Sequence, residues 1–186
     1  MTRDTVVAAN NSREIDQTLG ATSSSAAGTQ LGPVPSHQLI RYFGAIVFAG
    51  FVLIELWEMV QMSAYAGMDG LSWKSTLSLC TWAAAGDVGI ILLIYTATAL
   101  TTGDFGWGLR ARWSDCVISA FVGLACAALL ENLALAAGLW RYADRMPVVA
   151  MLGAGLWPLL QMVLLPTLIF LIARWWSDCS APKEHV

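Results

Sequence analysis

The chain has 186 residues, of which 57% are apolar and only 12% are charged, and its net charge is −3. A soluble domain usually carries about 25% charged residues, and a nucleic-acid-binding protein needs a basic surface. The composition therefore predicts an integral membrane protein whose partners are membrane lipids, and it excludes nucleic acid. The length is that of one domain.

The first 36 residues differ in composition from the rest. Small and polar residues run from Gly20 to Gly28, and Pro33 and Pro35 follow. Such a segment has too little apolar surface to form a packed core, so residues 1–36 are predicted to be a disordered tail. We see no cleavable signal peptide and expect the first apolar helix to act as the insertion signal.

Four apolar stretches follow, each close to the ~20 residues that a helix needs to cross a bilayer. Trp and Tyr crowd their ends, which is typical of membrane interfaces. The predicted fold is all-α: a polytopic membrane protein with a four-transmembrane-helix bundle at 37–176 and a short tail at 177–186. The predicted spans are about 42–62, 77–100, 116–139 and 148–173.

Lys and Arg residues predict the orientation, because they concentrate on the cytoplasmic side. The two terminal flanks and the loop between the second and third spans hold seven of them, and the two opposite loops hold three. Both termini are therefore expected in the cytoplasm, with the chain in a bacterial inner membrane.

Four carboxylates lie within the predicted spans: Glu55 and Glu58 in the first, Asp87 in the second and Glu131 in the third. An ionised carboxylate at the bilayer centre costs at least ~2.5 kcal/mol, and such residues usually face a bundle interior and serve function. With a helix rise of about 1.5 Å per residue, all four fall between the midplane and the outer interface. The pattern predicts one shared site in which at least one carboxyl holds a proton.

Further polar residues are expected around this site. Gln61 lies three residues beyond Glu58, and Gln161 is expected near the middle of the fourth span, between Pro158 and Pro166. Each proline would free a carbonyl upstream, which must then find a partner inside the protein.

The outer loop from Gly138 to Pro147 combines aromatic residues, arginines and a proline. It is either an interfacial turn or a lid over the acidic site, with Arg141 or Arg145 binding an anionic head group.

Two stretches resemble known families. Leu56-Trp57-Glu58 followed by Asp87 resembles the Trp-Glu and Asp pattern of small integral-membrane meroterpenoid cyclases. Glu131 followed by Gly138-Leu-Trp-Arg-Tyr142 resembles the Glu and Gly-x-Trp-x-Tyr pattern of small bacterial lycopene-cyclase-domain proteins. The resemblance implies membrane carboxyls that give and accept protons on an isoprenoid.

Three hypotheses follow. The first is an intramembrane acid–base isomerase or cyclase acting on an apolar, isoprenoid-like lipid, without a cofactor or metal. The second is a subunit of a proton- or cation-coupled transporter. The third is an accessory or assembly protein whose carboxyls only hold helices together. A homo-oligomer or a larger membrane complex is compatible with each.

In the enzyme hypothesis, Asp87 or Glu131 is the acid, and Glu58 is the base or stabilises a carbocation. Tryptophan rings would offer π-faces to that cation. The candidate substrate-binding residues are Glu55, Trp57, Gln61, Trp82, Trp140, Arg141, Tyr142 and Gln161.

Overall fold

The computed structural model describes residues 34–68, 70–110 and 112–179, so the predicted disordered tail lies almost wholly outside the described residues. The predicted fold class is confirmed, because four helices are long and apolar enough to cross a membrane. These helices are α2 (Ser36–Gln61), α3 (Trp73–Thr102), α5 (Trp113–Ala136) and α6 (Leu156–Cys179).

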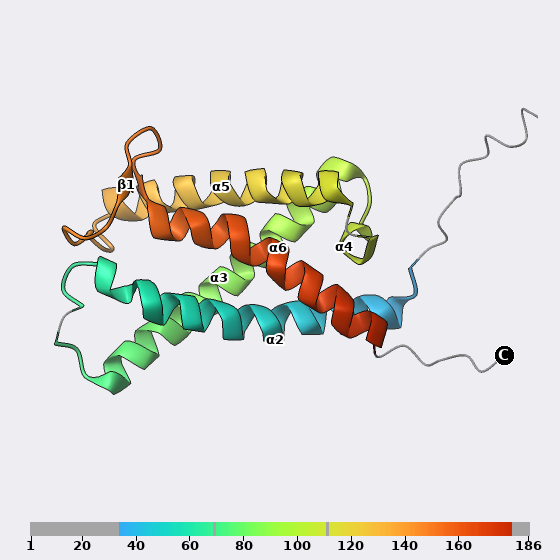
Figure 1. Ribbon diagram of the computed structural model, residues 1–186, viewed down its shortest axis with the longest axis horizontal. Coiled ribbons are helices and arrows are strands. Elements are labelled where there is room, and N and C mark those ends of the chain that lie inside the picture. Colours follow the sequence, from blue (N-terminus) through green and yellow to red (C-terminus); the bar gives the residue numbers. More distant parts are fainter. Residues whose placement is uncertain (1–33, 69, 111, 180–186) are drawn as a thin grey trace, which may run out of the picture. The chain divides into compact units, whose positions relative to one another are not determined.

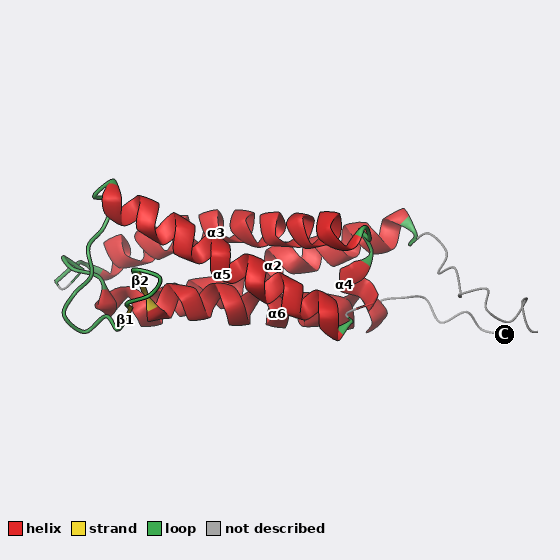
Figure 2. Ribbon diagram, turned by 90° about the horizontal axis from the view of Figure 1, so that it is seen from above, coloured by secondary structure: helices red, strands yellow, loops and turns green. Residues whose placement is uncertain are grey.

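Short elements connect the long helices. The 3-10 turn η1 (Met62–Ala64) extends α2, the single turn α4 (Trp107–Arg110) lies between α3 and α5, and β1 (Val148–Val149) pairs antiparallel with β2 (Ala154–Gly155). Figures 1 and 2 show the hairpin beside the start of α6. We call the end of the bundle at which α2 ends and α6 begins the site end.

Each helix packs against two neighbours in the ring α2–α3–α5–α6. The main core extends from the end of the bundle remote from the site end up to Ile54 and Ala84, and Tyr42, Tyr95 and Trp107 are fully buried in it. The rings of Tyr95 and Trp107 stack with centroids 5.0 Å apart. The Trp107 ring also meets Phe170 of α6, so this aromatic packing fixes α4 against α3 and α6.

The loop beyond α3 is held by an ion pair between Asp104 and Arg110. The slight burial of Asp104 disfavours its charge, but hydrogen bonds from Arg110 and from the Gly106 amide outweigh this effect. The pKa of Asp104 therefore lies below its usual range.

The fourth helix differs from the prediction, since it begins at Leu156 and not near residue 148. The intervening residues are apolar, so hydropathy cannot separate them from the helix, but they form the β1–β2 hairpin, in which Gly153 has a φ of +64°. The later start moves Gln161 to within two turns of the helix end, and not to the middle of the span. It also places Pro158 in the first turn, where its missing N–H has no intrahelical partner to lose.

Pro166 does lie inside α6, as predicted. Its missing N–H leaves the carbonyl of Met162 without a helical donor. That carbonyl points at Gly123 of α5 and approaches so closely that a Cβ atom at this position would overlap it. A Cα–H group is a weak donor to such a carbonyl, so glycine both admits the proline-freed oxygen and partly satisfies it.

Candidate functional site

A cavity of about 360 Å³ lies at the site end, between all four long helices. Its volume falls within the range of small-molecule sites, about 300–1,000 Å³. Its lining is mostly apolar, with a few convergent polar groups. The polar lining residues are Glu58, Gln61, Tyr65, Asp87, Glu131 and Gln161.

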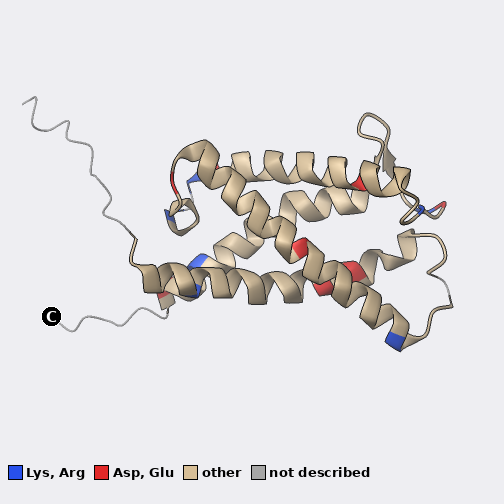
Figure 3. Cartoon of the chain, turned by 180° about the vertical axis from the view of Figure 1, so that it is seen from behind, with Lys and Arg blue, Asp and Glu red and all other residues tan. Residues whose placement is uncertain are grey.

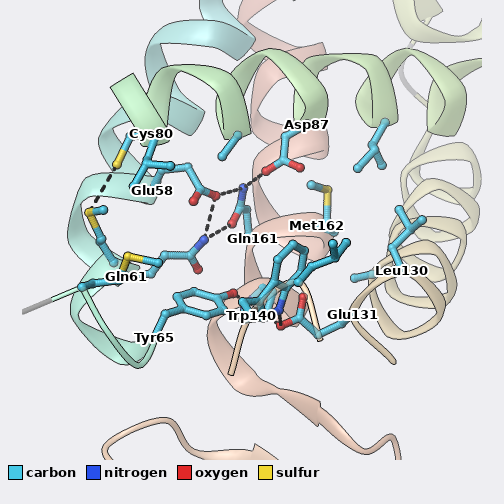
Figure 4. A pocket seen from close by; sticks show the side chains of 18 residues that line it. Glu58, Gln61, Tyr65, Cys80, Asp87, Leu130, Glu131, Trp140, Gln161 and Met162 are labelled. Atoms are coloured by element: carbon cyan, nitrogen blue, oxygen red, sulfur yellow. Dashed lines mark hydrogen bonds between the residues drawn. The ribbon is translucent and has the colours of Figure 1, made fainter. Parts of the chain in front are cut away.

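One wall of the cavity holds two carboxyl groups that share a single amide (Figure 4). Gln161 Nε2 donates to Asp87 Oδ2 at 2.5 Å and to Glu58 Oε1 at 3.0 Å. The two acceptor oxygens therefore cannot be farther apart than these two bond lengths combined. Three helices meet at this point, because Glu58 comes from α2, Asp87 from α3 and Gln161 from α6.

A second amide fixes the orientation of the first. Gln61 Nε2 donates to Glu58 Oε1 at 2.7 Å and to Gln161 Oε1 at 2.9 Å. Trp57 Nε1 donates to Gln61 Oε1 at 3.1 Å. An amide nitrogen has two protons, and each of these two amides donates both protons to acceptors within this network. Turning either amide over would set its oxygen against a carboxyl oxygen, which makes the arrangement directional.

Glu131 of α5 belongs to a second polar cluster, in which three aromatic donors converge on its Oε1. Tyr142 Oη donates at 2.7 Å, Trp140 Nε1 at 3.1 Å and Tyr65 Oη at 3.4 Å. The Tyr142 hydroxyl also accepts from the Gly155 amide at 2.7 Å. Glu131 is buried, and its small helix neighbours leave room for these rings.

The two tyrosines of this cluster keep their protons. Burial first, and then the charge of Glu131, raise the pKa of the Tyr65 hydroxyl well above its usual value. Burial first, and then the hydrogen bond to Glu131, do the same to the pKa of Tyr142. Both hydroxyls therefore stay donors across the physiological pH range.

Two connecting loops pair with each other over the site end. The Ala66 amide donates to the Arg141 carbonyl at 2.8 Å, and the Ala143 amide donates to the Ala64 carbonyl at 2.9 Å. Tyr65 and Tyr142 form the bridge between them, and the Arg145 side chain bonds the Ser63 carbonyl. This backbone pairing sets Trp140 and Tyr142 beside Glu131, although the loops are far apart in sequence.

Among the residues predicted from sequence, the structure brings Glu58, Gln61, Asp87, Glu131, Trp140 and Gln161 to the cavity wall. Tyr142 is not a lining residue, but its hydroxyl donates to Glu131, which is.

The other predicted residues lie away from the cavity. Glu55 accepts from Thr81 at 3.3 Å between α2 and α3. Trp57 supports Gln61 from outside and packs on Trp157. Trp82 is 77% exposed on the outer face of the bundle, so it cannot offer its ring to a ligand inside. Arg141 is exposed and is not a lining residue, so its proposed contact with a bound head group does not fit.

Tyr65 was missed by sequence reasoning, which assigned it only to the interfacial belt of aromatic residues. Its distance of 66 residues from Glu131 gives no local signal. Within residues 34–68, 70–110 and 112–179, no three His, Cys, Asp or Glu side chains are grouped closely enough to hold a metal ion.

Basic and acidic residues are distributed differently along the chain (Figure 3). Lys and Arg gather near helix ends and in loops, while acidic residues also occur within the helices.

Comparison with known proteins found no match, whether among family models, curated proteins or solved structures. The chain is therefore described by its own geometry: an integral membrane four-helix bundle with an acidic cavity at one end.

Proposed function

We propose that this protein is an intramembrane acid–base isomerase or cyclase acting on an apolar, isoprenoid-like lipid. The observation that carries the proposal is the composition of the cavity wall. The wall is mostly apolar, but the Glu58–Asp87 pair lies on one side of it and Glu131 on another. Titratable groups converging in an apolar pocket are what proton-transfer chemistry needs.

The reaction begins with a proton from the Glu58–Asp87 pair. Asp87 gives a proton to one carbon of a C=C bond, so a C–H bond forms and the neighbouring carbon becomes a cation. In a cyclisation, a second C=C bond then attacks that cation and forms a C–C bond. Glu58 takes a proton from the carbon next to the final cation, which restores a C=C bond. The proton then returns from Glu58 to Asp87, so the lipid is isomerised without gain or loss of atoms and the enzyme regains its starting state.

The opposite wall stabilises the cation. Trp140 and Tyr65 line the cavity with their rings 6.2 Å apart and nearly perpendicular, and aromatic faces attract cations within about 6 Å. The carboxyl oxygen of Glu131 lies close to both rings and accepts a hydrogen bond from each side chain. In this proposal, Tyr65 and Trp140 offer the π-faces to the cation, a role that the sequence analysis gave to Trp57 and Trp82 as well as Trp140.

The test compares lipids from cells that express the wild type or Asp87→Asn at matched protein levels. The purified enzyme is then incubated with the lipid so identified in D₂O. We expect a lipid made only by the wild type, with deuterium at carbon in the product.

Glu55→Gln is the matched control, because it also converts a helix carboxyl to an amide but lies outside the cavity. It should leave conversion unchanged. Identical lipid profiles for wild type and Asp87→Asn would contradict the enzyme proposal. Proton flux in liposomes that depends on Asp87, without lipid conversion, would instead indicate a proton-coupled transporter.

A further inference from the structure

Part of the cavity wall lies on the outer surface of the bundle, on the side of α3 and α5. Three of its lining leucines are exposed: Leu79 on α3, Leu130 on α5 and Leu139 just after α5. Figure 1 shows α3 and α5 diverging towards the site end. Leu79 and Leu130 lie within helices long and apolar enough to cross a membrane, where an exposed leucine contacts lipid chains and not water.

The aqueous end of the cavity is covered. The paired loops described above cross the site end, and the backbone amides of Ala66 and Ala143 each donate to the opposite loop. Tyr65 belongs to this pairing, and its side-chain hydroxyl donates to Glu131. A ligand that came from water would have to break this pairing, whereas one that came from the bilayer would only have to displace leucine side chains.

The lining also selects by charge. Of the described residues, those that line the cavity include three carboxyls but no Lys, Arg or His. The amide protons of Gln61 and Gln161 are all taken by the network. The nitrogen of Trp140 is likewise taken by Glu131. A phosphate or carboxylate group would therefore meet acidic oxygens and no free cationic partner, and burying an unpaired anion is costly.

We infer that the cavity takes up a neutral lipid sideways from the bilayer, between α3 and α5, and rejects phosphorylated lipids. This inference rests on the proposed function only for what happens to the lipid once it is inside. It names the substrate class more narrowly than the acid–base chemistry alone, since it excludes prenyl phosphates and diphosphates.

The test uses a prenyl alcohol that carries a diazirine on its chain, and the matching prenyl monophosphate, in liposomes containing the full chain. After irradiation, labelled residues are located by mass spectrometry. Cys80 and Met162 are the reporters, because both line the cavity and are only 3% and 5% exposed, so lipid outside the bundle cannot reach them. Ile46 reports on non-specific labelling, since it is fully buried in the core, twelve residues before Glu58 on α2, and does not line the cavity.

We expect the alcohol to label Cys80 and Met162 but not Ile46. The monophosphate should label only lipid-facing positions. Leu130→Trp should reduce cavity labelling several-fold by narrowing the opening. Leu129→Trp is the matched control, because Leu129 is a neighbouring, lipid-facing leucine on α5, 61% exposed, that does not line the cavity.

Three results would overturn the inference: unlabelled reporters in the wild type, equal labelling by the monophosphate, or equal effects of the two tryptophan variants. Failure of the proposed function is separable from each. Labelling of the reporters without Asp87-dependent deuterium incorporation would refute the enzyme and keep the lipid site. Incorporation without any effect of Leu130→Trp would keep the enzyme and refute the entry route.

Discussion

Replacing Gly123 by alanine should weaken the packing of α5 against α6. The added Cβ would overlap the carbonyl oxygen of Met162 and would lie 3.1 Å from the Met162 carbonyl carbon. These are backbone atoms of α6, which cannot turn aside as a flexible side chain can. Forcing an extra carbon into a packed contact costs about 1–3 kcal/mol, although alanine regains up to about 1 kcal/mol of helix propensity.

The matched control is Gly89→Ala on α3, where the added Cβ would meet nothing within 4 Å. That variant should be neutral or slightly stabilised. Both are measured by unfolding the purified protein with SDS in mixed micelles and following helix content. A difference of 1.4 kcal/mol corresponds to about tenfold in the unfolding equilibrium. If Gly123→Ala matches or exceeds the stability of Gly89→Ala, the close approach of the proline-freed carbonyl is not what joins these helices.

Two further predictions concern the loops. Tyr142→Phe should destabilise the protein more than Tyr65→Phe, because the Tyr142 hydroxyl makes bonds of 2.7 Å both to Glu131 and from Gly155, whereas Tyr65 makes one long bond; each net hydrogen bond is worth about 0.5–1.5 kcal/mol, and equal unfolding midpoints for the two variants would contradict this order. The lowered pKa of Asp104 means that its ionised form stabilises the folded state above the ordinary carboxyl pKa, about 4, and that this contribution disappears as the pH falls through the lower folded value. As the pH is lowered through this window, the unfolding midpoint of the wild type should fall more than that of Asp104→Asn, which lacks the titrating carboxyl. Parallel profiles for the two proteins would show that the ion pair contributes nothing.

The orientation with both termini in the cytoplasm remains a prediction from the Lys and Arg distribution. Localisation in a bacterial inner membrane likewise stays a prediction.

Local sequence was enough to predict four helices, since the free energy of inserting a span is a sum over its own residues. It was also enough to single out Glu58, Asp87 and Glu131, because a carboxyl in an apolar stretch is costly wherever it faces. It was not enough to separate the β1–β2 hairpin from α6, because the hairpin is as apolar as a helix and only the positive φ at Gly153 shows the turn.

The partners of those carboxyls were decided by tertiary structure. Gln161 is 103 residues from Glu58 and 74 from Asp87, and it reaches both only because α6 begins late and packs beside α2. Hydropathy has no information about the rotation of a helix about its axis, so it did not show that Trp82 faces outward. The sequence by itself determined that this chain places acidic groups in a membrane bundle. Only the packing of helices distant in sequence decided that two of these groups share one amide and that all three line one cavity, because such contacts depend on helix rotation and register and not on local composition.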